Sequence, residues 1–242
     1  MRIAPVVTVV LAAGLLAGLP GSVAPAPVAP RAERAPAGFV ALGDVAPGIR
    51  QDIRYAGGNN FVGEPIDGYP EAECLLAEDA ARALEAVRAA LAEDGLGLLV
   101  YDCYRPQRAV DHFLRWAKDP DATERRADFY PEVPKDRLFD EGYLAARSGH
   151  SRGGTVDLTL LGSDGEAVDM GTPFDFFDPA SHPDSEQPDP EQRRARERLR
   201  DAMSREGFVP IDTEWWHFTY RQEPYPDEHF DFPVERAALG TG

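Results

Sequence analysis

The sequence predicts an α+β fold in which helices pack on a mainly antiparallel sheet. Two patterns carry this prediction. Apolar residues recur every three or four positions over 75–93, which is typical of a helix with one buried face. Apolar and polar residues alternate from Thr155 to Leu160, which is typical of a strand. Other helical and strand-like segments alternate along the chain, which ends in two strands.

The first half of this order begins in a turn-rich segment, 38–69. The helix at 75–93 comes next and ends at a pair of glycines. A continuous apolar run at 98–101 has the length of a strand. Arg105-Pro106 then opens a second helix, because proline is favoured in the first turn, and this helix ends near Asp119-Pro120.

The second half begins with residues 121–145, which are polar and irregular. The alternating strand at 155–160 follows. An acidic, proline-containing loop then leads into a charged helix at 190–206, which Gly207 closes. Strands are predicted at 208–211 and 215–220.

The N-terminal segment has the layout of a secretory signal. Arg2 is followed by an apolar run over 3–19 and then by small residues. We therefore predict a signal peptide at 1–26, a Pro/Ala linker at 27–37, one domain at 38–242, and a secreted or extracytoplasmic protein. An uncleaved N-terminal anchor is the alternative. Beyond this segment the sequence predicts no membrane contact.

Overall composition excludes some partners. The chain has 242 residues and a formal net charge of −17, which argues against binding to nucleic acid or to anionic lipid. The oligomeric state is left open. Cys74 and Cys103 are the two cysteines. In an exported protein such a pair favours one disulfide, with two buried thiols as the alternative.

His150 and Asp157 stand in a sequence context that suits a metal. The stretch "SGHSRGGTVDLTL" places His150 among glycines and Asp157 on the polar side of an apolar strand. A buried carboxylate needs a partner, because an unpaired buried charge is costly. The partner could be a cation, or it could be Arg152 or another arginine.

Glu214 and His217 add to this pattern in "EWWHFTY". Positions three apart face opposite sides of a regular strand, so the two can share a site only if the chain bends near Glu214. His150, Asp157 and His217 would then be three ligands with one open position, the usual make-up of a catalytic zinc site. Glu214 would be the base that activates the zinc-bound water. Unrelated buried polar residues are the alternative.

Arg105 follows an apolar strand and begins a helix, so we expect it at a strand end, where sites tend to lie. A guanidinium there could stabilise the oxyanion that forms when an amide is attacked. A structural arginine paired with an acidic residue is the alternative.

These same motifs resemble the D-alanyl-D-alanine dipeptidases, zinc peptidases that include those of vancomycin resistance, whose patterns are S-x-H-x-x-G-x-x-x-D and E-x-W-H. "YDCYRPQRAV", "MGTPFDFFD" and "EPYPDEHFDFPV" extend the resemblance, which covers nearly all of 38–234. It implies a single zinc-peptidase domain holding one zinc ion.

The resemblance also implies roles for individual residues. His150, Asp157 and His217 match the zinc ligands, Glu214 the general base, and Arg105 the residue that stabilises the tetrahedral intermediate. Residues matching substrate contacts are Ser148, Tyr143, Tyr55 and Asp175, of which Asp175 suits a free ammonium group. Two departures are Gly154-Thr155, where Ser or Ala types are expected, and Cys103, in a place often held by Gly. A Cys74–Cys103 bridge would brace the loop of Arg105.

The function implied is zinc-dependent hydrolysis of D-alanyl-D-alanine or a related D,D-dipeptide, with Glu214 activating the water and with zinc and Arg105 stabilising the oxyanion. Export favours cell-wall peptide turnover over antibiotic resistance. Two alternatives remain. One is a peptidoglycan D,D- or L,D-carboxypeptidase or endopeptidase, and the other is a non-catalytic zinc-containing binding module.

Overall fold

The computed structural model describes residues 33–240. The predicted signal peptide, 1–26, and the first part of the predicted linker lie outside the described residues. Within 33–240, no helix combines the length and the apolar character that a membrane span requires.

A five-stranded sheet forms the centre of the described domain, and a separate two-stranded sheet pairs β1 with β3. The helices are α1 (Leu42–Val45), α2 (Glu78–Ala92), α3 (Gln107–Lys118), α4 (Arg126–Phe129) and α5 (Pro190–Arg205). The strands are β1 (Phe39–Ala41), β2 (Arg50–Gln51), β3 (Leu75–Ala77), β4 (Gly97–Asp102), β5 (Thr155–Leu161), β6 (Phe208–Pro210) and β7 (His217–Tyr220).

The strand order of the main sheet is β2-β4-β5-β7-β6. Three of its four neighbouring pairs are antiparallel, and only β2 with β4 is parallel. The sheet is therefore mixed but mainly antiparallel, and the predicted α+β class is confirmed.

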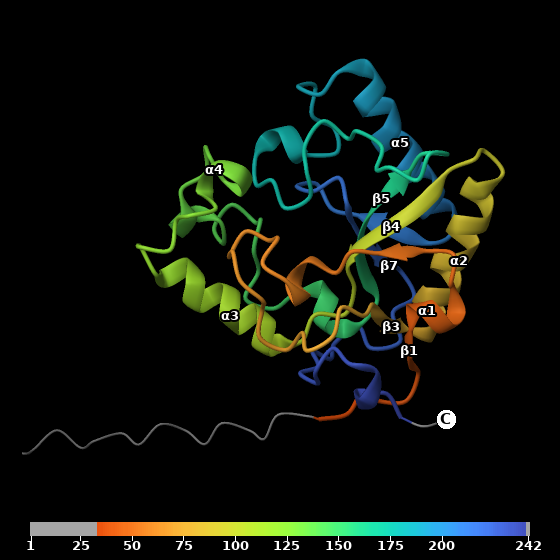
Figure 1. Ribbon diagram of the computed structural model, residues 1–242, viewed down its shortest axis with the longest axis horizontal. Coiled ribbons are helices and arrows are strands. Elements are labelled where there is room, and N and C mark those ends of the chain that lie inside the picture. Colours follow the sequence, from red (N-terminus) through yellow and green to blue (C-terminus); the bar gives the residue numbers. More distant parts are fainter. Residues whose placement is uncertain (1–32, 241–242) are drawn as a thin grey trace, which may run out of the picture. The chain divides into compact units, whose positions relative to one another are not determined.

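The long helices divide between the two sides of this sheet. α2 contacts β4, α5 contacts β5 and β6, and the two helices contact each other. Figure 1 shows α3 and α4 on the opposite side of the sheet from α2. Every residue of β5 is buried. Its polar face, including Asp157, is thus enclosed by protein as fully as its apolar face, which is the condition under which a carboxylate needs a partner.

Several predicted boundaries need correction. The predicted helix at 75–93 is a short strand followed by a helix, because β3 pairs in an antiparallel way with β1 before α2 begins at Glu78. The helix expected from Arg105 begins at Gln107, with Pro106 as its extended N-cap. The last strand begins at His217 and not at residue 215. The irregular stretch 121–145 contains the single-turn helix α4.

Cys74 and Cys103 form the predicted disulfide, with their Cα atoms 5.3 Å apart. Both side chains are buried. The bridge connects the start of β3 to the segment that follows β4, and so it lies immediately before Tyr104-Arg105.

Candidate metal centre and active site

Two aspartates and one histidine lie side by side on three neighbouring strands at the centre of the sheet. Asp102 at the end of β4 is paired in register with Asp157 on β5, and Asp157 is paired with His217 at the start of β7. Directly paired residues of neighbouring strands project to the same face of a sheet. The strand register alone therefore brings Asp157 and His217 together.

His150 reaches this row from a short 3-10 helix, Gly149–Arg152, that leads into β5. The Ser148 hydroxyl caps this turn by accepting a hydrogen bond from the His150 backbone N–H at 3.2 Å. Gly153 closes the turn with φ +82°, and a Cβ there would lie 2.3 Å from the Phe39 ring. Glycine is therefore required for the tight connection that delivers His150 to the start of β5.

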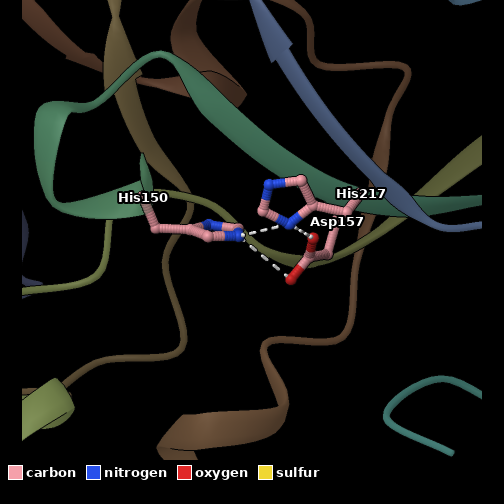
Figure 2. A group of neighbouring side chains, drawn as sticks. All are labelled: His150, Asp157 and His217. Atoms are coloured by element: carbon pink, nitrogen blue, oxygen red, sulfur yellow. Dashed lines mark hydrogen bonds and ion pairs between the residues drawn. The ribbon is translucent and has the colours of Figure 1, made fainter. Parts of the chain in front are cut away.

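The three predicted ligands converge as Figure 2 shows. His150 Nε2 lies 3.2 Å from Asp157 Oδ2 and 3.2 Å from His217 Nδ1. His217 Nδ1 lies 3.0 Å from Asp157 Oδ1. One donor atom from each residue lies within 4.8 Å of the others, so the three could hold one ion.

The protonation and hydrogen bonding of these groups fit a zinc ion. His150 Nδ1 lies 2.7 Å from the Cys103 carbonyl oxygen, so it is the protonated nitrogen and leaves Nε2 with a free lone pair. Burial lowers the pKa of His217, which favours its neutral form. Asp157 Oδ1 lies 3.0 Å from His217 Nδ1, but it accepts no hydrogen bond of regular geometry from the described residues. Two imidazole nitrogens and a carboxylate are a donor set typical of zinc.

The alternative interpretation, in which an arginine is the partner of Asp157, holds only in part. Arg152 does not serve it, because its guanidinium pairs with Glu223 at 2.8 Å. Arg105 Nη2 lies 3.5 Å from Asp157 Oδ2. Burial opposes ionisation of Asp157, but the two histidines outweigh it and hold the pKa below its usual range. Positive charge on the neighbouring imidazoles thus favours the ionised carboxylate, and a bound cation would do the same in their place.

Glu214 approaches the same centre because the chain turns before β7. Residues 215–216 form the turn, and β7 starts only at His217. Glu214 Oε2 lies 3.6 Å from His217 Nδ1, so the predicted bend near Glu214 is confirmed. Burial raises the pKa of Glu214 well above its usual range, and the charges of Asp157 and Asp175 raise it further.

Arg105 is held beside the centre by Asp102, a residue that the sequence analysis did not identify. Arg105 Nε and Nη2 lie 2.9 and 2.8 Å from Asp102 Oδ2, and Tyr69 donates its hydroxyl to the other carboxylate oxygen at 2.7 Å. Asp102 Oδ2 also lies 3.4 Å from His150 Nδ1. Asp102 thus fixes Arg105 and faces His150. It shows the same signal as Asp157, a carboxylate in a strongly apolar strand.

All the predicted site residues line one small cavity of about 160 Å³. Its polar lining includes the metal-site residues His150, Asp157, His217 and Glu214, together with Arg105, Ser148, Tyr143, Tyr55 and Asp175. For comparison, pockets for drug-sized ligands are roughly 300–1,000 Å³. The space therefore suits a small ligand.

Asp175, one of the predicted substrate contacts, has an uncommon backbone conformation and a buried carboxylate. Its backbone has φ +61°, a left-handed conformation that is uncommon for residues other than glycine. The Tyr55 hydroxyl donates to its carboxylate at 3.0 Å. Burial raises the pKa of Asp175 well above its usual range, and the charge of Asp157 adds to this. Asp175 is thus a buried carboxylate that a cationic group would stabilise in its ionised form.

Tyr143 lies at the rim with a partner that the sequence analysis also missed. Its hydroxyl lies 3.2 Å from His182 Nε2. His182 comes from the acidic loop before α5, and nothing in its local sequence indicates this contact.

Gly154 departs from the residue types expected at its position for a local reason. A Cβ there would lie 2.7 Å from Cγ of Glu223, the partner of Arg152.

Comparison with known proteins agrees with this geometry. The family model described as D-ala-D-ala dipeptidase matches residues 35–235. The chain is 43% identical to a D-alanyl-D-alanine dipeptidase of Streptomyces coelicolor over 197 residues, which is 81% of this chain and 98% of that protein. Identity to the D-alanyl-D-alanine dipeptidase of Enterococcus faecium is 40% over 199 residues, 82% of this chain and 98% of that protein.

A more distant relative, the D-alanyl-D-alanine dipeptidase of Escherichia coli, is 35% identical over 184 residues, which is 76% of this chain and 85% of that protein. The family match at 35–235 spans all the elements from β1 to β7. The chain belongs to the D-ala-D-ala dipeptidase family of zinc metallopeptidases.

Proposed function

We propose that this protein hydrolyses the peptide bond of D-alanyl-D-alanine or a closely related D,D-dipeptide, with one zinc ion held by His150, Asp157 and His217. One observation carries the proposal. Glu214 lies within 3.6 Å of a predicted ligand atom, His217 Nδ1, in the same enclosed cavity as the buried carboxylate of Asp175. The site therefore combines a base beside a metal centre with an acceptor for a free amine.

The bound ion and Glu214 would share the chemistry of attack. Zinc, when bound, supplies positive charge that acidifies water, polarises a carbonyl group and favours the ionised form of Glu214. Glu214 accepts the proton of the attacking water as its oxygen bonds to the carbonyl carbon. Glu214 then donates that proton to the amine that leaves when the carbon–nitrogen bond breaks. The Glu214 side chain is 9% exposed, which limits competing exchange with bulk water.

Arg105 is suited to stabilise the negative oxygen formed during attack. Its guanidinium lies over the Tyr55 ring, 4.9 Å from the centroid, and is fixed by Asp102. A donor that is already oriented needs no reorganisation when charge develops, which is why such donors are effective in dry sites. Burial of Arg105 adds to this effect, because little water is present to screen its charge.

Asp175 favours substrates with a free amino group. Its burial makes the unpaired carboxylate costly, and a substrate ammonium is the compensating charge. The small volume of the cavity and the position of Asp175 inside it favour a dipeptide over a longer peptidoglycan stem. Ser148 and Tyr143, which also line the cavity, offer hydroxyl groups for the remaining polar atoms of the substrate.

We further propose that the protein is exported and acts in cell-wall peptide turnover. The N-terminal sequence supports export. The Cys74–Cys103 disulfide supports it independently, because such bonds persist in oxidising compartments.

A dipeptide panel tests the proposed activity. The purified protein is assayed on D,D-, L,D- and L,L-dipeptides, with and without a chelator, and on N-acetylated D-alanyl-D-alanine. We expect turnover of the D,D-dipeptide, loss with chelator and recovery with zinc, and little turnover of the acetylated form. Preferred release of D-alanine from longer stem peptides would instead indicate a carboxypeptidase. A zinc-loaded protein that is inert on the whole panel would contradict an enzymatic role.

A further inference from the structure

Arg196 is a buried arginine far from the metal centre in sequence. It lies on α5, a helix whose outward face is highly charged, but its own side chain is in register with Leu199 and Met203 on the buried face. Only 3% of Arg196 is exposed. A buried guanidinium is costly unless its donors are satisfied, so its contacts indicate what it does.

The guanidinium binds both ends of one loop, residues 170–182. Nε donates to the Met170 carbonyl at 2.7 Å and Nη2 to the Thr172 hydroxyl at 3.2 Å, at the start of the loop. Nη1 donates to the carbonyls of Ala180 and His182 at 2.9 and 3.0 Å, at its end. All four acceptors are neutral oxygens. Arg196 therefore cross-links the base of the loop and neutralises no carboxylate there.

The loop that Arg196 closes carries Asp175 near its midpoint. Thr172 and Ser181 bond across the loop at 2.9 Å, and the Ser181 hydroxyl donates to the Phe176 carbonyl at 2.6 Å. These bonds hold the two halves of the loop together on either side of Asp175, whose φ of +61° is uncommon for residues other than glycine. A strained residue keeps its conformation only where its surroundings fix it.

The same loop is joined to the turn that carries Glu214. Trp215 donates its indole N–H to the Thr172 hydroxyl at 3.0 Å and its backbone N–H to the Ser181 carbonyl at 3.0 Å. Trp215, the residue directly after the proposed base, thus holds the 170–182 loop beside the Glu214 turn. The position of Asp175 relative to Glu214 is set through this link.

We infer that Arg196 is a positioning residue for recognition of the substrate's amino group, because it closes the 170–182 loop so that Asp175 points into the cavity. The inference rests on the proposed function of Asp175. A lysine can replace Arg196 only in part, since a single ammonium cannot reach all the acceptors at the two ends of the loop as a planar fork does. Burial lowers the pKa of Arg196 to about 10, and it therefore stays charged at neutral pH.

Steady-state kinetics of Arg196→Met on D-alanyl-D-alanine and on its N-acetylated form tests the inference. We expect KM for the free dipeptide to rise about tenfold or more, as for the loss of charged hydrogen bonds. KM for the acetylated form should change little, so the preference for the free amine should fall. Bound zinc, measured by mass spectrometry, should stay at the wild-type level. Arg196→Lys should restore only part of the preference.

Arg193→Met is the matched control. Arg193 lies one turn earlier on α5 and also bonds loop carbonyls, but at Glu186 and Pro188, beyond the segment that carries Asp175. We expect wild-type KM values from this variant. If Arg196→Met fails to fold, Thr172→Val takes its place, because it removes the hydroxyl on which Arg196 and Trp215 converge. It should shift KM in the same direction by a smaller factor.

The possible outcomes distinguish the proposed role of Asp175 from that of Arg196. A wild-type enzyme that does not distinguish free from acetylated dipeptide refutes the proposed role of Asp175. A wild-type enzyme that distinguishes them, together with a folded, zinc-loaded Arg196→Met or Thr172→Val variant of unchanged preference, overturns the role of Arg196 alone. An equal loss on both substrates also overturns it, because this indicates general damage.

Discussion

The two sides of the cavity are built in different ways. On the sheet side, Asp157 and His217 are directly paired residues of β5 and β7, and His150 enters through one tight turn. On the loop side, Asp175 lies in the irregular 170–182 segment, whose ends are held by Arg196 from α5. Regular backbone pairing places two of the three proposed metal ligands, whereas side-chain hydrogen bonds place the residue proposed to bind the amine.

This difference has a consequence for substitution. A ladder of backbone hydrogen bonds does not depend on one side chain, so the sheet side should keep its geometry when a ligand is replaced. The loop side depends on a few buried polar groups, and it should lose its geometry when one of them is removed. Substitutions on the sheet side should therefore remove chemistry without disturbing the fold.

The largest effect is expected from His150→Ala. The variant loses one of three ligands, so metal binding should fall by several orders of magnitude and turnover should fall to background. Metal analysis after dialysis measures the first effect, and a dipeptide assay the second. Circular dichroism should match the wild type. A variant that retains one equivalent of zinc would exclude His150 as a ligand.

Glu214→Gln should separate metal binding from proton transfer. The amide keeps the size of the side chain but cannot accept the proton, so kcat should fall by about 10²–10⁴-fold while zinc content is unchanged. Rapid kinetics and metal analysis on the same sample measure the turnover and the zinc content, respectively. Near-normal turnover would show that another group is the base.

Asp102→Asn tests whether the sheet side also positions Arg105. The substitution removes the charge that holds the guanidinium, and kcat should fall by about 10–100-fold with little change in KM. Asp231→Asn is the matched control. Asp231 Oδ1 lies 2.9 Å from Nε of Arg108, an arginine three residues after Arg105. Equal losses in the two variants would argue against a specific role for Asp102.

The smallest effect on catalysis is expected from removing the disulfide. Cys74→Ser combined with Cys103→Ser should lower the free energy of unfolding by about 2–4 kcal/mol, as for a bridge with a sequence separation of 29. Denaturant titration measures this change. The sheet holds the ligands independently of the bridge, so kcat should stay within about threefold of the wild type, and a much larger loss would show that the bridge positions the site.

The sequence alone predicted the sheet side better than the loop side. Local spacing in "SGHSRGGTVDLTL" and "EWWHFTY" identified the residues that converge, and strand geometry required the bend that is found before His217. Strand β3 was not predicted, because Leu75–Ala77 also fits the helical pattern and is a strand only through its pairing with β1. Arg196 and His182 were missed because their partners are 14 or more residues away and include backbone carbonyls, which no side-chain pattern records.

Anomalous diffraction at the zinc edge from crystals of the zinc-loaded protein tests the central claim most directly. The account predicts one peak within about 2.0–2.2 Å of His150 Nε2, a carboxylate oxygen of Asp157 and His217 Nδ1, with Glu214 outside coordination distance. A peak elsewhere, or a peak with Glu214 as a direct ligand in place of one of the three, would contradict the division between ligands and base on which the proposed mechanism depends.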